Sequence, residues 1–222
     1  MASMPPTRIN LPESVTTGRM IAVLRADTGE HIVEVARVLE ELGVRCVEVT
    51  LTTPGALDAI CELAAAARPG VAIGAGTVLD VPTLEDAHEA GATFSLSPVA
   101  DPEVTRRATQ IGIAHVPGAA TPTEILTAWQ DGAAAVKVFP AHSLGGPSFI
   151  KSVRDPLPDI PLIPTGGVAA DQVSSYLGAG AVAVGVGSPL TGESLATGPT
   201  PEFRERAGAF LESVRLYSET AR

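Results

Sequence analysis

The sequence predicts an α/β protein, a single (β/α)8 TIM barrel with an N-terminal extension and a C-terminal helix. Eight short apolar runs alternate with longer segments of helical spacing, and strict alternation of strands and helices is typical of a parallel sheet. Most of the runs are apolar at successive positions, as in parallel strands that helices cover. The 222 residues suit a compact barrel, because about 250 residues is typical of this fold.

An open, doubly wound sheet is the structural competitor. The count of eight units and the glycine turns after the last two runs favour the closed barrel. No linker or charge run divides the chain, so we expect residues 1–222 to form one barrel domain, with residues 1–18 as an N-terminal arm and short helix. In order, the predicted strands cover residues 20–25, 44–50, 71–76, 92–97, 113–118, 134–139, 160–167 and 181–187.

The segments between the strands carry residues that begin and end helices. In the segment 32–42, apolar side chains recur on one helical face. Thr53, Asp101 and Thr121 each precede a proline, and this order is typical of an N-cap followed by proline in the first turn. A last helix is predicted at about residues 202–217. Five glycines are expected to end helices, where a left-handed residue is needed: Gly43, Gly91, Gly112, Gly132 and Gly178.

Composition and charge exclude several classes of protein. With 45% hydrophobic and 18% charged residues the chain is not intrinsically disordered. Its net charge of −10 argues against nucleic-acid or anionic-membrane partners. Two cysteines, Cys46 and Cys61, provide no disulfide framework or zinc motif. The N-terminus lacks the apolar region of a secretory signal and no run is long enough for a membrane helix, so we expect a cytoplasmic protein.

The active site of such a barrel lies at the C-terminal ends of its strands. This rule selects a short list of side chains and turns. They are Arg25, Glu48, Thr50, Thr77, Ser97, Lys137, Phe139, Thr165, and the turns at 166–167 and 187–188.

Lys137 is the most informative of these residues. The chain has 15 lysines and arginines, of which only Lys137 and Lys151 are lysines, and Lys137 lies inside the apolar strand AAVKVF. Arginine does not lose its proton in a protein, whereas a desolvated lysine can become a neutral amine nucleophile. Lys137 is therefore a candidate Schiff-base lysine that attacks a carbonyl group. The alternatives are a lysine that extends from a strand end to solvent, or a point charge that binds phosphate.

Glu48 places a charge in the middle of another apolar strand. By alternation its side chain shares a face with Cys46 and Thr50. A buried carboxylate is costly unless it is paired, and burial raises its pKa toward the range useful for proton transfer. Glu48 is either an acid/base group or one partner of a structural salt bridge with Lys137 or an arginine, and these two interpretations are compatible.

Two glycine turns follow the last two strands, in PTGG and VGVGS. Glycine lets backbone N–H groups approach an anion closely, and this corner of the barrel is the usual phosphate site. Gly166, Gly167, Gly187 and Ser188 are therefore candidate phosphate ligands, although each turn alone is explained by a need for positive φ. Among the remaining residues, His115 is interpreted as a core histidine and Cys46 as a packing residue.

Several motifs, in order, resemble one family, the aldolases of 2-keto-3-deoxy-6-phosphogluconate (KDPG) and 4-hydroxy-2-oxoglutarate (KHG). They run from about Arg19 to the C-terminal helix. They are GVRCVEVTL, GAGTVL, SLSP, VPGAATPTE, AVKVFPA, PTGGV and GVGS. The resemblance implies a class I aldolase that needs no metal or other cofactor and forms homotrimers.

The resemblance also implies a role for each matched residue. Lys137 would form the carbinolamine and then the Schiff base, and Glu48 would move protons and release glyceraldehyde 3-phosphate, with pyruvate as the second product. Thr77 would bind the pyruvyl carboxylate, and Pro98 and Phe139 would shape the pocket. Gly166, Gly167, Gly187 and Ser188 would hold the phosphate.

The sequence departs from the family pattern at Thr52. Many members have an arginine at this position, four residues after the glutamate, where it helps to bind the carboxylate. Other members with threonine there have an arginine at the end of the first strand, as Arg25 is here. Our hypothesis is that Arg25 supplies the cation, because a guanidinium suits a bidentate carboxylate contact.

Three other functions remain as alternatives. A 2-keto-3-deoxy-6-phosphogalactonate aldolase also has an arginine in the first strand, but Thr50 favours the gluconate substrate. A phosphate-binding barrel enzyme without Schiff-base chemistry, metal-dependent or not, would use Lys137 only as a charge. A catalytically inactive trimeric binding module would need neither Lys137 nor Glu48.

Overall fold

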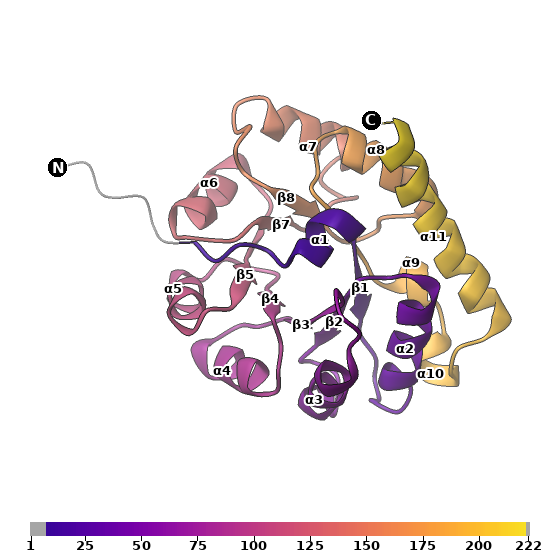
Figure 1. Cartoon of the computed structure of the whole chain (residues 1–222). Coiled ribbons are helices and arrows are strands. Elements are labelled where there is room, and N and C mark those ends of the chain that lie inside the picture. The colour runs from indigo at the N-terminus through magenta and orange to yellow at the C-terminus, as the bar shows by residue number, and fades with distance from the viewer. Residues whose placement is uncertain (1–7, 221–222) are drawn as a thin grey trace.

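The computed structural model describes residues 8–220, in which short parallel strands lie at the centre and helices surround them (Figure 1). The strands are β1 (Met20–Leu24), β2 (Cys46–Thr50), β3 (Ala72–Gly76), β4 (Phe94–Leu96), β5 (Ala114–Val116), β6 (Gly118–Ala119), β7 (Val136–Val138), β8 (Leu162–Pro164) and β9 (Val184–Val186). Each predicted strand therefore contains an observed one. Residues 1–7 of the expected N-terminal arm lie outside the described residues.

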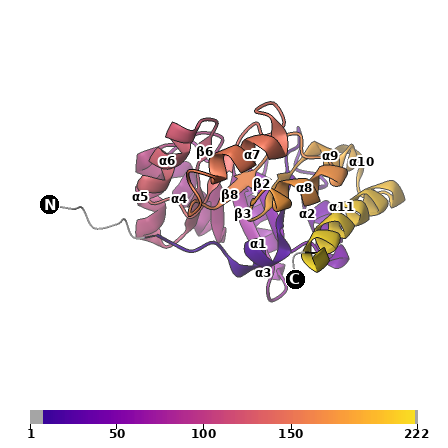
Figure 2. The same cartoon turned by 90° about the horizontal axis from the view of Figure 1, so that it is seen from above.

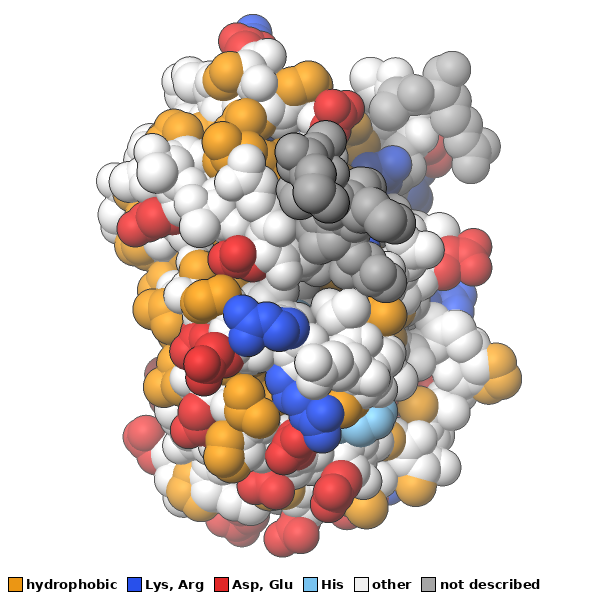
Figure 3. Space-filling model, turned by 90° about the vertical axis from the view of Figure 1, so that its left-hand side faces the viewer, with side chains coloured by type: hydrophobic (Ala, Val, Ile, Leu, Met, Phe, Trp, Pro, Cys, Tyr) orange, Lys and Arg blue, Asp and Glu red, His pale blue; other side chains and the backbone are white. Residues whose placement is uncertain are grey.

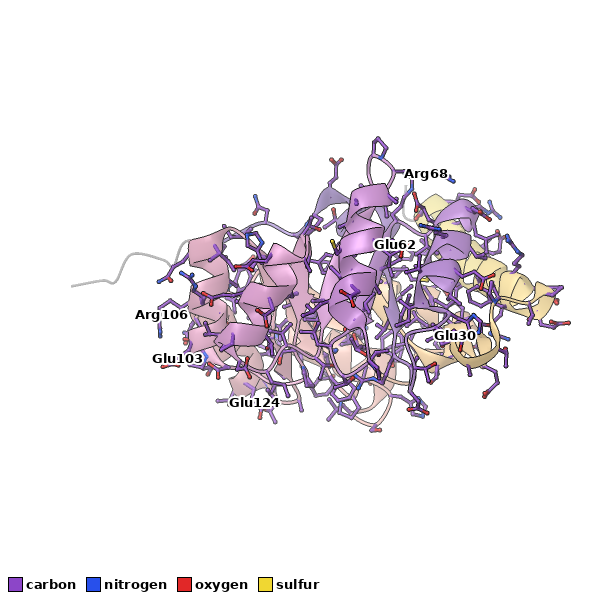
Figure 4. All side chains as sticks on the ribbon, turned by 90° about the horizontal axis from the view of Figure 1, so that it is seen from below. Glu30, Glu62, Arg68, Glu103, Arg106 and Glu124 are labelled. Carbon is purple, nitrogen blue, oxygen red and sulfur yellow. The ribbon has the colours of Figure 1, made fainter. Side chains whose placement is uncertain are left out.

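The helices form the outer layer, seen from a second direction in Figure 2. They are α1 (Glu13–Gly18), α2 (Ile32–Leu42), α3 (Ala56–Ala66), α4 (Val81–Glu89), α5 (Pro102–Ile111), α6 (Pro122–Gln130), α7 (Gly146–Arg154), the 3-10 helix η1 (Ala170–Gln172), α8 (Val173–Gly178), α9 (Ser188–Thr191), α10 (Ser194–Thr197) and α11 (Pro201–Thr220). Charged side chains such as Glu62 and Glu103 stand on the outer faces of these helices (Figure 4).

The parallel α/β class is confirmed, but the strands form two sheets rather than the single eight-stranded ring that the sequence predicts. One sheet has six strands in the order β5-β4-β3-β2-β1-β9, and the other has three in the order β6-β7-β8. The predicted strand 113–118 is divided into β5 and β6 at Pro117, which has no N–H group for the ladder. Backbone contacts link the sheets on both sides. On one side Ala134 N donates to His115 O and Lys137 N to Pro117 O, both at 2.9 Å. On the other side Val182 N donates to Leu162 O at 3.0 Å, and a bridge joins Thr165 and Gly185.

Two apolar clusters lie on the two faces of the strands. The larger one fills the space between strands and helices. The smaller one contains the alternate residues of the strands, among them Ile21, Cys46, Phe94 and Ile163, together with Val15 of α1. Helix α1 contacts β1 and β2 and crosses the centre of the view in Figure 1. The interior is therefore filled by side chains at the end where the strands begin.

Most of the predicted helix boundaries agree with the structure. The helix 32–42 is confirmed, and Asp101 and Thr121 cap α5 and α6 through their side chains. Thr53 is not an N-cap: α3 begins at Ala56 after Gly55, because the Thr53 hydroxyl accepts instead from Ala26 N. Gly178 is the last residue of α8, and the left-handed residue is Gly180, with φ 100°.

The last helix, α11, runs over Pro201–Thr220 and is longer at both ends than the predicted 202–217. Within residues 8–220, none of the helices is both long enough and apolar enough to cross a membrane.

Candidate active site

A cavity of about 510 Å³ opens at the C-terminal ends of the strands. Its lining includes every residue to which the family resemblance gives a role except Glu48, and of the other strand-end candidates it includes Thr165 but not Thr50 or Ser97. The lining residues are Val23, Arg25, Thr77, Pro98, Lys137, Phe139, Thr165, Gly166, Gly167, Gly187, Ser188, Pro189, Thr191 and Gly192. Four other lining residues were not predicted from the sequence, because they lie in no charged or glycine-pair motif: Val23, Pro189, Thr191 and Gly192.

Lys137 extends from β7 into this cavity. It lies between Ala135, which belongs to the inner cluster, and Phe139, so alternation places its side chain on the inner face. The residue is 4% exposed, and Nζ lies 5.4 Å from the centroid of the Phe139 ring. An amine is thus held with little water around it at the wall of a cavity, and the free extension into solvent considered for this lysine does not occur.

Glu48 is buried next to this cavity in β2 and is 0% exposed. Within the described residues, neither carboxyl oxygen has a hydrogen-bond partner in the protein. Space for the carboxyl group comes from Gly76 on β3, because a Cβ atom there would overlap Oε1 of Glu48. A residue larger than glycine at position 76 would therefore displace the carboxyl group.

Two effects of opposite direction act on the pKa of Glu48. Burial raises the pKa of its carboxyl group above the usual value, while the positive charges of Lys137 and then Arg25 lower it, and burial is the larger effect. A carboxyl group that holds its proton to a higher pH than usual is better suited to act as a general acid as well as a general base.

Arg25 and Thr77 meet at the mouth of the cavity. The Arg25 guanidinium donates from Nη2 to Thr77 Oγ1 at 2.9 Å and from Nη1 to Thr52 Oγ1 at 3.1 Å. Because a guanidinium only donates hydrogen bonds, the Thr77 hydroxyl accepts from it and keeps its own proton for another acceptor. Thr77 has a φ of 60°, which is unusual outside glycine. This backbone conformation directs the Thr77 side chain toward Arg25. Together the two residues offer donors to an anionic ligand.

The glycine turns form another wall of the cavity. Gly166 and Gly167 have φ values of 97° and 75°, which other residues rarely adopt. A Cβ atom at Gly167 would lie 2.7 Å from Cβ of His142, so the turn also passes too close to the next loop for a side chain. The second turn ends at Ser188, the first residue of α9, and both turns border the same cavity.

The residues interpreted as structural lie outside the cavity lining. His115 is buried with Nδ1 2.9 Å from Ser95 Oγ, and burial lowers its pKa to about 4. Burial raises the pKa of the Cys46 thiol to about 11. Ser97, which the strand-end rule selected, accepts a hydrogen bond from Val99 N instead of facing the cavity. In residues 8–220, no three histidine, cysteine, aspartate or glutamate side chains lie close enough together to hold a metal ion.

These features define an α/β enzyme with parallel strands, whose site at the strand ends combines a buried amine, a buried carboxyl group and donors for an anion. The family described as KDPG and KHG aldolase matches residues 11–200. A 2-dehydro-3-deoxy-phosphogluconate aldolase of Pseudomonas aeruginosa is 38% identical over 159 residues, 72% of each chain.

Two further comparisons point to the same family. A probable 2-dehydro-3-deoxy-6-phosphogalactonate aldolase of Rhizobium meliloti is 36% identical over 193 residues, 86% of this chain and 89% of the relative. The crystal structure of a KDPG aldolase of Legionella pneumophila, with pyruvate captured as a covalent carbinolamine, superposes with a TM-score of 0.76 at 28% identity, covering 92% of this chain and 96% of that one. The chain belongs to the KDPG and KHG aldolase family. It is an aldolase, a lyase of carbon–carbon bonds.

Replacing Glu48 with glutamine should change how stability depends on pH. The folded protein keeps the Glu48 proton to a higher pH than the unfolded chain does, because burial raises this pKa. The free energy of unfolding contributed by this group therefore falls as pH rises from the unfolded pKa through the folded one. We expect the urea midpoint of Glu48→Gln, relative to the parent, to increase from pH 5 to pH 8.

The exposed Glu62, which pairs with Arg37 on the outer surface, provides the matched control. Glu62→Gln should show no comparable increase, because an exposed carboxylate loses little solvation on folding. A difference between Glu48→Gln and the parent that stays constant from pH 5 to pH 8 would contradict this account of the site.

Proposed function

We propose that this aldolase cleaves KDPG to pyruvate and glyceraldehyde 3-phosphate by a class I, Schiff-base mechanism. The same site would cleave 4-hydroxy-2-oxoglutarate to pyruvate and glyoxylate. The observation that carries the proposal is the single lysine in the cavity lining, Lys137, almost completely buried beside the buried carboxyl group of Glu48. The carbinolamine named for the Legionella pneumophila relative supports the same chemistry.

In the proposed reaction, neutral Lys137 Nζ attacks the C2 carbonyl carbon of the substrate. The carbonyl oxygen takes a proton to give a carbinolamine, and loss of water leaves a protonated Schiff base. The positive nitrogen then accepts the electron pair of the C3–C4 bond as that bond breaks. The product still attached to Lys137 is an enamine, which takes a proton at C3 and is hydrolysed to pyruvate and free lysine.

Glu48 is proposed as the acid/base group for these steps. It would supply and remove the protons of carbinolamine formation and dehydration, and then take the proton of the C4 hydroxyl as the aldehyde forms. Its raised pKa supports both directions of transfer, and it is buried close enough to Lys137 for that side chain to act on the pKa of the carboxyl group. The cleavage therefore needs no group to carry protons other than this carboxyl and water.

The two ends of the substrate would be held by different walls of the cavity. Arg25 and Thr77 would bind the carboxylate at C1, supported by their mutual hydrogen bond and by the free Thr77 proton. Gly166, Gly167, Gly187 and Ser188 would bind the phosphate through backbone N–H groups and the serine hydroxyl. Pro98 and Phe139 would confine the carbon chain near Lys137.

The galactonate epimer is the second candidate substrate. It is supported by the relative from Rhizobium meliloti, which is named a probable phosphogalactonate aldolase, and by Arg25 at the end of β1. The two substrates differ at one stereocentre. Comparing kcat/KM for the two epimers decides between them, and a higher value for the galactonate substrate would favour the second candidate.

We also propose that the two sheets act as one closed (β/α)8 barrel domain. The backbone contacts between β7 and Pro117 and between β8 and β9 support closure on both sides. The cytoplasmic location expected from the sequence stays a prediction.

The enzyme should form a homotrimer. Three of the six exposed large apolar side chains of the described residues lie in or just before α4, α5 and α6. Leu79 and Val99 are about half exposed, at 51% and 52%, and Leu126 lies on α6. Figure 3 shows apolar side chains among charged ones on this side of the molecule. Association would remove such side chains from water. Sedimentation equilibrium should give about three times the chain mass of 22.6 kDa, and the mass of a single chain would contradict the trimer.

Reduction with borohydride in the presence of pyruvate should attach one pyruvyl group to Lys137. The adduct is stable because borohydride reduces the Schiff base between pyruvate and the lysine to a secondary amine. Peptide mass spectrometry locates the adduct with little ambiguity, since Lys151 is the only other lysine. Lys137→Arg should give no adduct, whereas Lys151→Arg, which changes a lysine on α7, should be labelled like the parent. An adduct on Lys151 alone, or none, would return Lys137 to the role of a phosphate-binding charge.

Replacing Arg25 with alanine should raise the KM for pyruvate, measured by trapping, about tenfold or more. A hydrogen bond to a charged group contributes about 1.5–3 kcal/mol, and the alanine variant would lose the bidentate contact between the guanidinium and the pyruvate carboxylate. Arg37→Ala is the matched control, because Arg37 pairs with Glu62 on the outer helices and should leave KM unchanged. An unchanged KM in Arg25→Ala would show that another group binds the carboxylate.

A further inference from the structure

Behind Arg25 lies a continuous chain of threonine hydroxyl groups. Thr52 Oγ1 accepts from Arg25 Nη1 at 3.1 Å and donates to Thr50 Oγ1 at 3.3 Å. Thr50 Oγ1 lies 3.1 Å from Thr53 Oγ1, and Thr53 Oγ1 accepts from Ala26 N at 3.1 Å. The chain thus starts at the Arg25 side chain and returns to the backbone of the next residue.

The direction of the first two hydrogen bonds is determined by the guanidinium. Because Arg25 only donates, the Thr52 hydroxyl must accept from it, and its own proton is free to go to Thr50. The Thr50 hydroxyl accepts from Thr52, so its own proton is free to be donated to Thr53 Oγ1. Hydrogen bonds aligned in this way polarise one another. The arrangement holds one particular position of the guanidinium, although Arg25 itself is exposed.

None of the three threonines lines the cavity, so none of them is a ligand of the substrate there. Two of the five N–H groups of Arg25 are used by Thr52 and Thr77, which leaves three for an anion. Thr50 and Thr53 are buried at 0% and 3%, and they anchor Thr52 to the ends of β1 and β2. The ordering of Arg25 is therefore built into the protein before a substrate arrives.

We propose that Thr52 is a positioning residue, which with Thr50 and Thr53 behind it holds the Arg25 guanidinium in place for the carboxylate of the 2-keto acid. This inference rests on the proposed function, in which Arg25 binds that carboxylate. Holding the guanidinium in advance removes the loss of side-chain freedom that binding would otherwise bring. Thr52 would therefore affect the affinity for the keto acid rather than the chemistry at Lys137.

The test compares Thr52→Val with Thr52→Ser in borohydride trapping with pyruvate. Valine keeps the shape but loses the hydroxyl, whereas serine keeps the hydroxyl. We expect Thr52→Val to need about fivefold more pyruvate for half-maximal labelling, the order of one lost hydrogen bond, with unchanged labelling of Lys137 at saturation. Thr52→Ser should behave like the parent. Equal half-saturation in Thr52→Val and the parent, or a serine variant as weak as the valine variant, would overturn the proposal.

A double-mutant cycle with Arg25→Ala tests whether Thr52 acts through Arg25. If it does, Arg25→Ala/Thr52→Val needs no more pyruvate than Arg25→Ala alone, because the group that Thr52 holds is already absent. Additive effects would show that Thr52 acts independently and would overturn the proposal. Failure of the parent itself to be labelled by pyruvate would overturn the proposed function, and it is therefore distinguishable from failure of this inference alone.

Discussion

The burial of two ionisable side chains, on β2 and β7, is the constraint on which the rest of the site depends. A carboxyl group and an amine lose most of their hydration at Glu48 and Lys137, and neither has an ion-pair partner within the described residues. Such burial is costly unless the groups stabilise each other or stay uncharged. The raised pKa of Glu48 and the opposing charges of Lys137 and Arg25 show both effects at work. The free energy lost by burying Glu48 is what raises its pKa and lets this carboxyl group keep a proton that it can give up.

The remaining interior is arranged around this pair. At the end where the strands begin, Val15, Phe94 and other apolar side chains exclude water from below the two groups. At the other end, glycine at position 76 gives Glu48 its space and glycine at position 185 does the same for Thr165. Glycine is therefore needed at both positions, because a Cβ atom there would overlap the side chain of Glu48 or of Thr165.

Much of this arrangement could be predicted from the sequence, for a physical reason. A charged residue inside an apolar strand, as in AAVKVF and CVEVT, is rare enough to stand out, and parallel strands bring their C-terminal ends together. Features that depend on loop conformation could not be predicted. Thr53 resembles an N-cap because proline follows it, but its hydroxyl is used by Ala26 and Thr50, and α3 starts later. The division of the fifth strand at Pro117 likewise reflects a hydrogen bond that proline cannot donate.

Arg25, the arginine proposed to bind the carboxylate, shows why position in space matters more than position in a motif. A sequence pattern that requires arginine at position 52 would exclude this chain from the aldolases that bind the keto-acid carboxylate through an arginine. The end of β1 lies beside the end of β2, with Leu24 paired to Val49, so side chains from either strand reach the same volume. Arg25 Nη1 lies 3.1 Å from Thr52 Oγ1, and the guanidinium therefore extends to where a long side chain from position 52 would begin. With the cation at the end of β1, a small polar residue suits position 52 at the end of β2. Threonine there leaves room for the guanidinium and accepts a hydrogen bond from it.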